Sequence, residues 1–299
     1  MSDTMRFGFV ALLGAPNTGK STLLNRVVGA KVSIVTPKAQ TTRSRILGIR
    51  MVGKTQIVFV DTPGIFQPRR RLDRAMVSAA WSGASDADMV VLLIDAARGV
   101  DAGTRAIAAR LVETGRPVVL VLNKIDAAPK TKLLALTSDL NTAASYAATF
   151  MISATTGDGV DDLVQFLAGR VPEGQWHFPE DQLSDINERL FAAEVTREKL
   201  FFELTQELPY AAFVETEAWE ERPDGSVRIS QTIIVEKDSQ KKIVVGKGGA
   251  RVKAIGEAAR RDLERLLERQ VHLFLFVKVR AGWGEDPDSY QTLGLDFRS

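Results

Sequence analysis

The chain contains no cysteine, so disulfide bridges and thiolate zinc sites are excluded. The same absence favours a reducing cytoplasm as the home of the protein, because no bridge has to form. Histidine is almost as scarce. The two histidines, His177 and His272, are too far apart in the sequence to predict a local metal pair, and we expect both to be structural or surface residues.

Long apolar runs are missing as well. No segment approaches the roughly 18 apolar residues of a membrane-spanning helix, and the start MSDTMRFGFVALLG lacks the basic leader and the cleavage site of a signal peptide. These absences predict a cytoplasmic protein. The formal net charge of +2 is too small to identify a partner, so an argument about nucleic acids depends on where the charges lie.

The residues that are present predict a soluble protein of two domains. The chain has 299 residues, more than the about 100 to 200 of one typical domain. Up to about residue 170, short runs rich in Val, Ile and Leu alternate with amphipathic segments, which predicts an α/β layer with a mainly parallel sheet. Strands are expected at residues 6–14, 56–62, 89–95, 117–124 and 149–154, with residues 43–51 as an antiparallel hairpin partner of residues 56–62.

The pattern changes after Val171. Residues 172–185 carry prolines, a glycine and several acids without periodicity, which is typical of a linker. The rest predicts, in order, a helix from Asn187, two strands around the turn Asp224-Gly225, a glycine loop, a long helix and a last strand. We therefore predict a first domain at residues 1–172, a linker at 173–186, and a smaller α+β domain with a C-terminal tail at 187–299.

The stretch GAPNTGKS at residues 14–21 follows a predicted strand and begins a predicted helix, the context in which a phosphate-loop pattern is a strong signal. Its glycines let backbone N–H groups surround phosphate oxygens at the start of the helix, where the helix dipole also favours anions. Lys20 is expected to reach the β and γ phosphates, and Ser21 to ligate magnesium. The alternative is a glycine turn before an ordinary helix, for which a Lys-Ser pair has no structural need.

The segment NKID, at the end of another predicted strand, favours guanine over adenine. Asp126 can accept hydrogen bonds from the N1–H and the exocyclic amine of guanine, while Asn123 faces the opposite edge of the base. Adenine lacks this pair of donors and would leave a buried carboxylate unpaired, which is costly. The segment ISA at residues 152–154 is expected to present a backbone amide to the guanine oxygen. Alone, NKID also fits a surface turn; its order behind the phosphate loop favours the base-binding interpretation.

The segment DTPG at residues 61–64 also ends a strand. Asp61 is placed to hold magnesium through water, and the N–H of Gly64 to meet the γ phosphate, so the loop that follows would respond to that phosphate. The predicted nucleotide-binding residues are Gly14, Ala15, Pro16, Asn17, Thr18, Gly19, Lys20, Ser21, Thr22, Asp61, Thr62, Pro63, Gly64, Ile65, Asn123, Lys124, Ile125, Asp126, Ser153 and Ala154.

The motifs GAPNTGKST, DTPG, NKID and ISA occur in the order found in translation-factor-like GTPases. With KAQTTRSRILGI, HFPED, REKLF, ELPY and VVGKGGARVKAIG, nearly the whole chain resembles the Era family of bacterial ribosome-assembly GTPases. The resemblance implies a P-loop GTPase domain with a mixed, mainly parallel sheet, followed by a type II KH domain. It also implies magnesium-dependent GTP hydrolysis, binding to the 3′ region of small-subunit (16S) ribosomal RNA, and assistance to small-subunit assembly.

The resemblance also implies how hydrolysis is catalysed. Era-like enzymes lack the glutamine that orients water in Ras-type proteins, and Ile65 cannot replace it. In related GTPases a phosphate-loop asparagine helps to hold a potassium ion, and Asn17 matches that position; the alternative is that Asn17 only tightens the loop. Thr42 matches the magnesium-sensing threonine of the first switch, with Thr41 and Thr36 as alternatives. The predicted catalytic residues are Asn17, Lys20, Thr42 and Gly64, and the predicted magnesium ligands are Ser21, Thr42 and Asp61.

The loop GKGG at residues 246–249 predicts the RNA-binding site. A G-x-x-G turn before a helix lets the backbone approach a sugar-phosphate chain, and residues 239–256 carry five cations and no acid. We expect bases to lie against the apolar runs IIV and IVV at residues 233–235 and 243–245; a purely structural turn is the alternative. The predicted RNA-binding residues are Lys241, Lys242, Gly246, Lys247, Gly248, Gly249, Arg251 and Lys253.

The predicted cofactors are GTP or GDP, Mg²⁺ and K⁺. The predicted partners are small-subunit ribosomal RNA and the assembling small subunit, bound by a monomer. The resemblance further implies a cytoplasmic location with peripheral association at the cytoplasmic face of the inner membrane, and a coupling of assembly to cell growth and division. A signalling GTPase with protein effectors and a membrane-linked cell-cycle GTPase are alternatives. The basic run Arg69 to Arg71 fits a solvated face as well as an RNA contact.

Overall fold

The computed structural model describes residues 4–204 and 208–299 of the chain. These residues form two compact units. The first unit contains residues 4–33, Ala39–Asp185 and Gly294–Ser299, and the second contains Ile34–Lys38 and the described residues of Ile186–Leu293. No helix within the described residues is long and apolar enough to cross a lipid bilayer.

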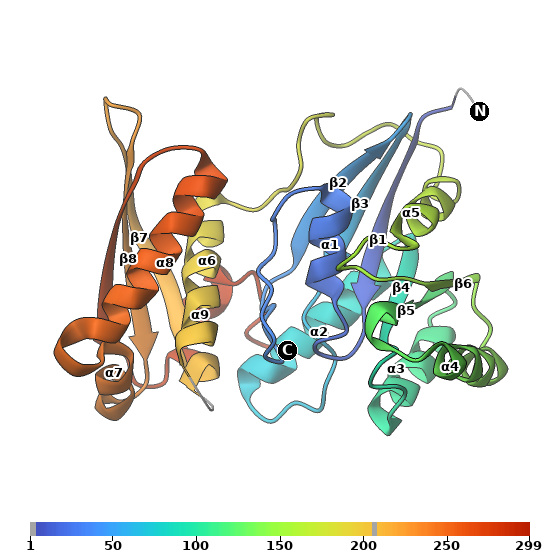
Figure 1. The fold of residues 1–299 in the computed structure, drawn as a ribbon, viewed down its shortest axis with the longest axis horizontal. Helices are drawn as coiled ribbons and strands as arrows, with labels where there is room; N and C mark the ends of the chain where they lie inside the picture. Colours follow the sequence, from blue (N-terminus) through green and yellow to red (C-terminus); the bar gives the residue numbers. More distant parts are fainter. Residues whose placement is uncertain (1–3, 205–207) are drawn as a thin grey trace. The chain divides into compact units, whose positions relative to one another are not determined.

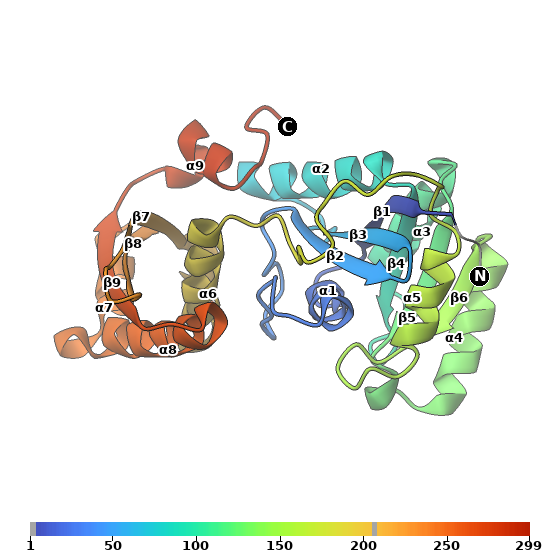
Figure 2. The same ribbon diagram turned by 90° about the horizontal axis from the view of Figure 1, so that it is seen from above.

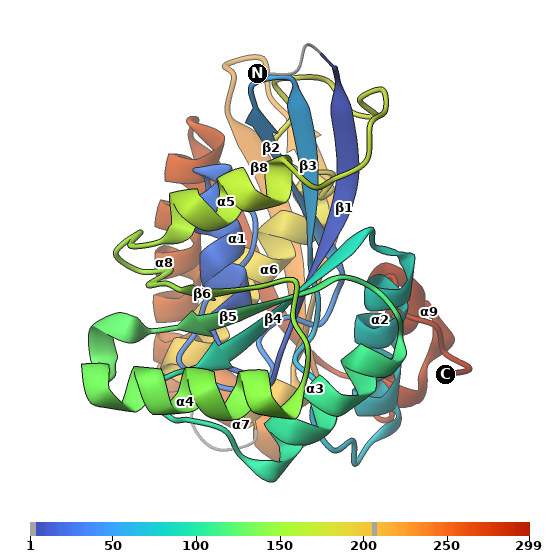
Figure 3. The same cartoon turned by 90° about the vertical axis from the view of Figure 1, so that its right-hand side faces the viewer.

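The first unit is built on a sheet of strand order β2-β3-β1-β4-β5-β6 (Figure 1). Only β2 runs antiparallel to its neighbour, and β3 and β1 lie side by side in parallel (Figure 3). The predicted mixed, mainly parallel sheet and its hairpin are therefore confirmed. The strands are β1 (Arg6–Leu13), β2 (Ile46–Val52), β3 (Thr55–Asp61), β4 (Met89–Asp95), β5 (Val118–Asn123) and β6 (Ala148–Met151).

Helices cover both faces of this sheet, which explains why its strands read as continuous apolar runs. Apolar side chains of α2, α3 and α4 share one buried cluster with alternate residues of β1, β4 and β5. Figure 2 shows α1 and α2 on opposite sides of β2 and β3. The helices are α1 (Lys20–Val28), α2 (Arg71–Asp86), α3 (Ala102–Glu113), α4 (Lys130–Ala143) and α5 (Val160–Ala168).

The segment expected as a linker lies with the first unit up to Asp185. The buried side chain of Gln56 on β3 accepts hydrogen bonds from the amides of His177 and Phe178, each at 3.1 Å. The His177 ring stacks on Phe7 with centroids 3.9 Å apart. The amide of Ile49 on β2 donates to the carbonyl of Leu183 at 2.8 Å. The composition of this segment is typical of a loop and did not predict that its backbone would form hydrogen bonds with the sheet.

The second unit is a sheet of order β7-β8-β9 with α6 and α8 on one face (Figure 1). β8 pairs antiparallel with β7 and parallel with β9. The predicted order of helix, two strands, glycine loop, helix and strand is present. The elements are α6 (Glu188–Glu203), β7 (Phe213–Glu221), β8 (Val227–Val235), α7 (Asp238–Val245), α8 (Ala250–Leu267), β9 (Val271–Val279) and α9 (Pro287–Thr292).

Two helices of the second unit were not predicted. α7 contains Ile243, Val244 and Val245, whose β-branched side chains favour extended backbone, but burial of Val244 outweighs that preference. The Gln240 side chain begins α7 by accepting from the Lys237 amide at 3.1 Å. α9 lies in the expected tail, and the pair Asp286-Pro287 at its start was a readable signal, since Asp is favoured at the N-cap and Pro at the first helical position.

Candidate nucleotide site and nucleic-acid interface

The phosphate loop joins β1 to α1 and closes on itself. The hydroxyl of Thr18 donates to the carbonyl of Ala15 at 3.0 Å. Gly19 has φ 96, and a Cβ atom there would lie 2.3 Å from Nδ2 of Asn123, so only glycine fits this position. No side chain within the described residues caps the first turn of α1, whose N–H groups, including those of Ser21 and Thr22, therefore remain available to an anion.

Lys20 is buried directly above this loop. Its ammonium donates to the carbonyls of Gly14 at 3.2 Å and Ala15 at 3.1 Å. Burial lowers the pKa of Lys20 to about 8, and the nearby charge of Asp61 opposes this shift. The loop therefore holds a cation that is short of counter-charge, and a phosphate would supply it.

Hydroxyl groups converge on the buried carboxylate of Asp61, at the end of β3. Its Oδ2 accepts from Ser21 at 2.6 Å, from Ser33 at 3.0 Å and from Thr42 at 3.4 Å. Ser21 and Thr42 lie 2.9 Å apart, so the structure brings the three predicted magnesium ligands together. Ser33 also belongs to this cluster, but no motif pointed to it.

The Asp61 carboxylate fits a hard cation. Its Oδ1 is buried and has no hydrogen-bond partner among the described residues. Burial raises the pKa of Asp61, and the hydroxyls of Ser21, Ser33 and Thr42 oppose the shift. An unpaired buried oxygen beside two hydroxyls is the ligand chemistry that Mg²⁺ accepts, directly or through its water.

The segment after Asp61 is in direct contact with the phosphate loop. Thr62 donates its hydroxyl to the carbonyl of Leu12 at 2.8 Å, and the amide of Ile65 donates to the carbonyl of Gly14 at 3.1 Å. A Cβ atom on Gly64 would lie 2.8 Å from the backbone of Pro16, so this close approach requires glycine. Pro16 thus serves as a rigid surface for the DTPG turn, and Pro63 is buried within that turn.

The expected base-binding residues lie where β5 and β6 end. Asp126 is exposed in the short 3₁₀ turn Ile125–Ala127, and its side chain makes no hydrogen bond within the described residues, so its carboxylate can accept from guanine. Lys124 has left-handed backbone at φ 65, and its ammonium lies 2.7 Å from Oδ2 of Asp95. This ion pair fixes the turn that presents Asp126.

Asn123 has a structural task that its motif did not reveal. Its side chain is buried, with Nδ2 donating to the carbonyl of Thr18 at 2.8 Å and Oδ1 accepting from the amide of Ala154 at 2.9 Å. The amide of Ser153 donates to the carbonyl of Asp158 at 2.9 Å. The amides expected to reach the guanine oxygen are therefore engaged within the protein, and Asn123 cross-links the phosphate loop to the ISA loop.

The G-x-x-G loop of the second unit connects α7 to α8. Gly246 and Gly248 have φ of 74 and 59, and a Cβ atom on Gly246 would lie 2.8 Å from Cβ of Arg251. The guanidinium of Arg251 donates to the carbonyl of Ile243 at 2.7 Å and so secures the loop. The predicted lysines lie around it: Lys242, Lys247 and Lys253 are exposed, and Lys241 is half-buried.

A cavity of about 390 Å³ lies between α8 and β9. Val252, Leu273 and Leu275 give it an apolar floor, and its polar lining residues are Lys253, Glu257 and Arg260. The expected base contacts at residues 233–235 and 243–245 were wrong in part. Ile233, Ile234, Val235 and Val244 are fully buried, because the sheet and helices pack them into the core.

The basic run Arg69 to Arg71, where α2 begins, has two structural roles. The amides of Arg69 and Arg70 donate to Asp73, each at 3.0 Å, which begins the helix. The Arg71 guanidinium lies 4.5 Å from the ring centroid of Phe297 and donates to the carbonyl of that residue at 3.3 Å. Arg71 therefore holds the C-terminal residues of the first unit, while the side chains of Arg69 and Arg70 are exposed.

A phosphate loop, a hydroxyl-ringed aspartate and an NKID turn at the carboxyl ends of a mainly parallel sheet define a P-loop nucleotide-binding protein. Residues 9–124 match the model of the family described as 50S ribosome-binding GTPase, and residues 207–284 match the KH domain. GTPase Era of Rhizobium meliloti (strain 1021) is 60% identical over 98% of this chain and 93% of its own length. GTPase Era of Sinorhizobium medicae (strain WSM419) is 59% identical over 98% of this chain and 94% of its own length.

Solved structures agree with this likeness. A point variant of Aquifex aeolicus Era, bound to GDP·AlF₄⁻, has 38% identity and a TM-score of 0.92, covering 97% of this chain and 99% of the other. Era in complex with MgGDPNP and nucleotides 1506–1542 of 16S ribosomal RNA has the same identity, TM-score and coverage. The chain belongs to the Era family of GTPases.

Replacing Gly19 with Ala will weaken binding of a fluorescent GDP analogue by about tenfold or more, because the added methyl group collides with Asn123 at a strained φ. Gly29→Ala is the matched control, since Gly29 also has positive φ (80) but a Cβ atom there meets no described atom within 4 Å. Equal affinity of the two variants would contradict the requirement for glycine at position 19.

Binding of GDP will be accompanied by proton uptake that grows as the pH rises through the pKa of Lys20. A phosphate beside the ammonium raises its pKa, so the free protein must take up the proton that it lacks: about one tenth near pH 7 and about half near pH 8. Calorimetry in two buffers of different ionisation enthalpy, with EDTA present, measures this number. Identical apparent enthalpies in both buffers at pH 8 would rule out the shift.

Proposed function

We propose that this protein hydrolyses GTP and uses its nucleotide state to control its binding to the 3′ region of 16S ribosomal RNA, and thereby assists assembly of the small ribosomal subunit. The observation that carries the proposal is the G-x-x-G loop, with its exposed lysines, beside an apolar groove in the same chain as a complete phosphate loop. A structure 38% identical to this chain holds MgGDPNP and nucleotides 1506–1542 of that RNA, which supports the same ligands here.

The nucleotide site supports attack of water on the γ phosphate. Lys20 would offset charge that develops on the phosphate oxygens, and the amide of Gly64 would donate to the γ phosphate. Ser21, Thr42 and Asp61 would hold Mg²⁺, which neutralises phosphate charge when bound. Ile65 is buried and apolar, so no side chain at the position after the DTPG turn orients the water.

Asn17 is the residue through which potassium would act. It is exposed in the phosphate loop, and its carboxamide supplies an oxygen of the kind that binds an alkali ion. Its φ of 65 gives a second reason for asparagine, which tolerates the left-handed region better than most residues. A substitution that preserves the backbone but removes the carboxamide separates the two roles.

Asn17→Gly will therefore retain GDP affinity and lose the stimulation of GTP hydrolysis by K⁺ over Na⁺, because glycine adopts positive φ freely. The measurement is the single-turnover hydrolysis rate in matched KCl and NaCl. Undiminished stimulation in the variant would assign Asn17 to loop geometry alone.

RNA would bind with its sugar-phosphate chain against the G-x-x-G loop and its bases in the groove between α8 and β9. The exposed Lys242, Lys247 and Lys253 attract phosphates, and the apolar floor receives unstacked bases. We also infer a cytoplasmic monomer that associates peripherally with the inner membrane and couples assembly to growth and division. These last inferences rest on the family resemblance.

Crosslinking in cells followed by sequencing of bound RNA tests the proposed function. Reads will accumulate at the 3′ end of 16S ribosomal RNA with the wild type and will fall about tenfold or more with Gly248→Asp, which places a negative charge in the loop. Gly225→Asp is the matched control, because Gly225 also has positive φ (80) and open surroundings but lies in the β7–β8 turn. Scattered reads, or equal reads from both variants, would favour a signalling GTPase that acts through protein effectors.

A further inference from the structure

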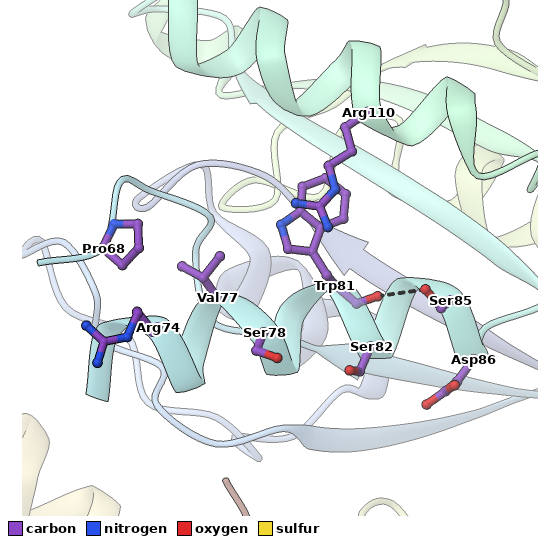
Figure 4. Close-up of a pocket in the computed structure, with 9 residues that line it drawn as sticks. All are labelled: Pro68, Arg74, Val77, Ser78, Trp81, Ser82, Ser85, Asp86 and Arg110. Carbon is purple, nitrogen blue, oxygen red and sulfur yellow. Dashed lines mark hydrogen bonds between the residues drawn. The ribbon is translucent and has the colours of Figure 1, made fainter. Parts of the chain in front are cut away.

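A second cavity lies on the outer face of the first unit, between α2 and α3 (Figure 4). Its volume is about 520 Å³, within the range of cavities that bind ligands or anchor side chains. A row along α2 from Arg74 to Asp86 forms most of the lining, at spacings that place these residues on one helix face. Pro68 closes one end, and Arg110 of α3 closes the side.

The floor of this cavity is apolar and rigid. It contains Val77 and Trp81, and Trp81 packs against the buried cluster beneath α2 and α3. The Arg110 guanidinium lies over the Trp81 ring, 4.0 Å from its centroid, and covers one face of the indole, as Figure 4 shows. Trp81 therefore offers no open ring face on which a nucleobase could stack, but its edge remains available to an apolar side chain.

The lining of the cavity is positively charged. Arg74 and Arg110 are exposed, and neither forms an ion pair with any carboxylate in residues 4–204 and 208–299. Asp86 also lines the cavity but lies 3.9 Å from Arg45, which offsets its charge. Two arginines without carboxylate partners, beside an apolar floor, complement carboxylates that flank an apolar side chain.

The cavity adjoins the part of the chain that responds to nucleotide. Pro68 follows the DTPG turn by four residues, and Ile65 belongs to the same buried cluster as Ala80 and Ala84 of α2. Ile65 therefore connects the DTPG turn by direct packing to the side chains beneath the cavity floor, and a movement of that turn would be passed to them.

We propose that this cavity is a docking site for an acidic segment of a protein partner. Its carboxylates pair with Arg74 and Arg110, and one apolar side chain fills the space over Val77 and Trp81. RNA is the poorer occupant, because the Arg110 guanidinium covers the exposed face of the Trp81 ring and leaves no stacking surface for a base. The proposed docking does not depend on the proposed function. A difference in the affinity for the acidic segment between the GTP and GDP states does rest on the proposed nucleotide switch.

A displayed library of random peptides, selected on the full-length protein loaded with a non-hydrolysable GTP analogue, tests this proposal. Peptides of about 12 residues are long enough to span the lining row on α2 from Arg74 to Asp86, whether they bind as a helix or extended. Enriched peptides will carry two or more Asp or Glu residues around a large apolar residue. Their affinity, measured by fluorescence anisotropy, will fall about tenfold or more in R74E/R110E.

The matched control is R50E/R170E, which makes the same charge change at two exposed arginines of the first unit outside the cavity. Arg170 lies over the ring of Phe166 as Arg110 lies over that of Trp81, and the peptide affinity of this variant will stay near that of the wild type. S82E is a second test variant, because it adds a repelling charge at an exposed position of the lining and leaves the stacking of Arg110 on Trp81 in place. GTP hydrolysis and RNA crosslinking are measured separately and will be retained in all three variants, so failure of docking is distinguishable from failure of the proposed function.

Enriched peptides without acidic residues, an absence of enrichment, or equal losses of peptide affinity in R74E/R110E and R50E/R170E would overturn the docking site. If R74E/R110E weakens the binding of a 12-nucleotide RNA and no acidic peptide binds the wild type, the cavity is an RNA site and the proposed protein partner is wrong. Equal peptide affinities of the GDP and GTP-analogue forms would overturn the nucleotide dependence.

Discussion

The nucleotide site depends on one buried carboxylate. Asp61 lies at the end of β3 with no exposed surface, and such a charge persists in a protein only where partners offset the cost of desolvation. Three hydroxyls supply these partners: Ser21 of α1, Ser33 in the segment after α1, and Thr42 in the loop before β2. Hydrogen bonds to this one carboxylate therefore hold together three segments that are separate in the sequence. Lys20 is also buried, and its ammonium lacks sufficient negative charge nearby. A bound phosphate would supply that charge.

Asn123 supplies the neutral counterpart of this arrangement. A buried carboxamide must satisfy both its donor and its acceptor, and here it does so with the phosphate loop on one side and the ISA loop on the other. The two halves of a nucleotide site, one for phosphates and one for the base, are thereby held at a set distance. That cross-link requires glycine at position 19, since any side chain there would occupy the space of the Asn123 carboxamide.

The second unit uses a different device to approach an anion. Its loop contains glycines with positive φ, which bring the backbone to the surface without side chains in the way, and it places lysines around the edge. The groove beside it is apolar because alternate residues of β9 face α8, an arrangement that strand periodicity creates. Charge outside and apolar surface inside match the two parts of a single-stranded nucleic acid.

The sequence by itself determined the sheet of the first unit and the order of the predicted elements in the second, and it located the GAPNTGKS, DTPG, NKID and GKGG motifs, because hydrophobic periodicity and glycine turns are local signals. Only the tertiary structure decided that Ser33 joins Asp61, that Asn123 bridges two loops, and that residues 233–235 lie in the core. It decided as well that residues 172–185 bind in turn to β1, β3 and β2. It also decided that α7 is a helix, since packing of Val244 outweighs the β preference of its neighbours. These outcomes depend on contacts between residues far apart in the chain. A local sequence pattern does not show which distant residue will become the partner of a buried group.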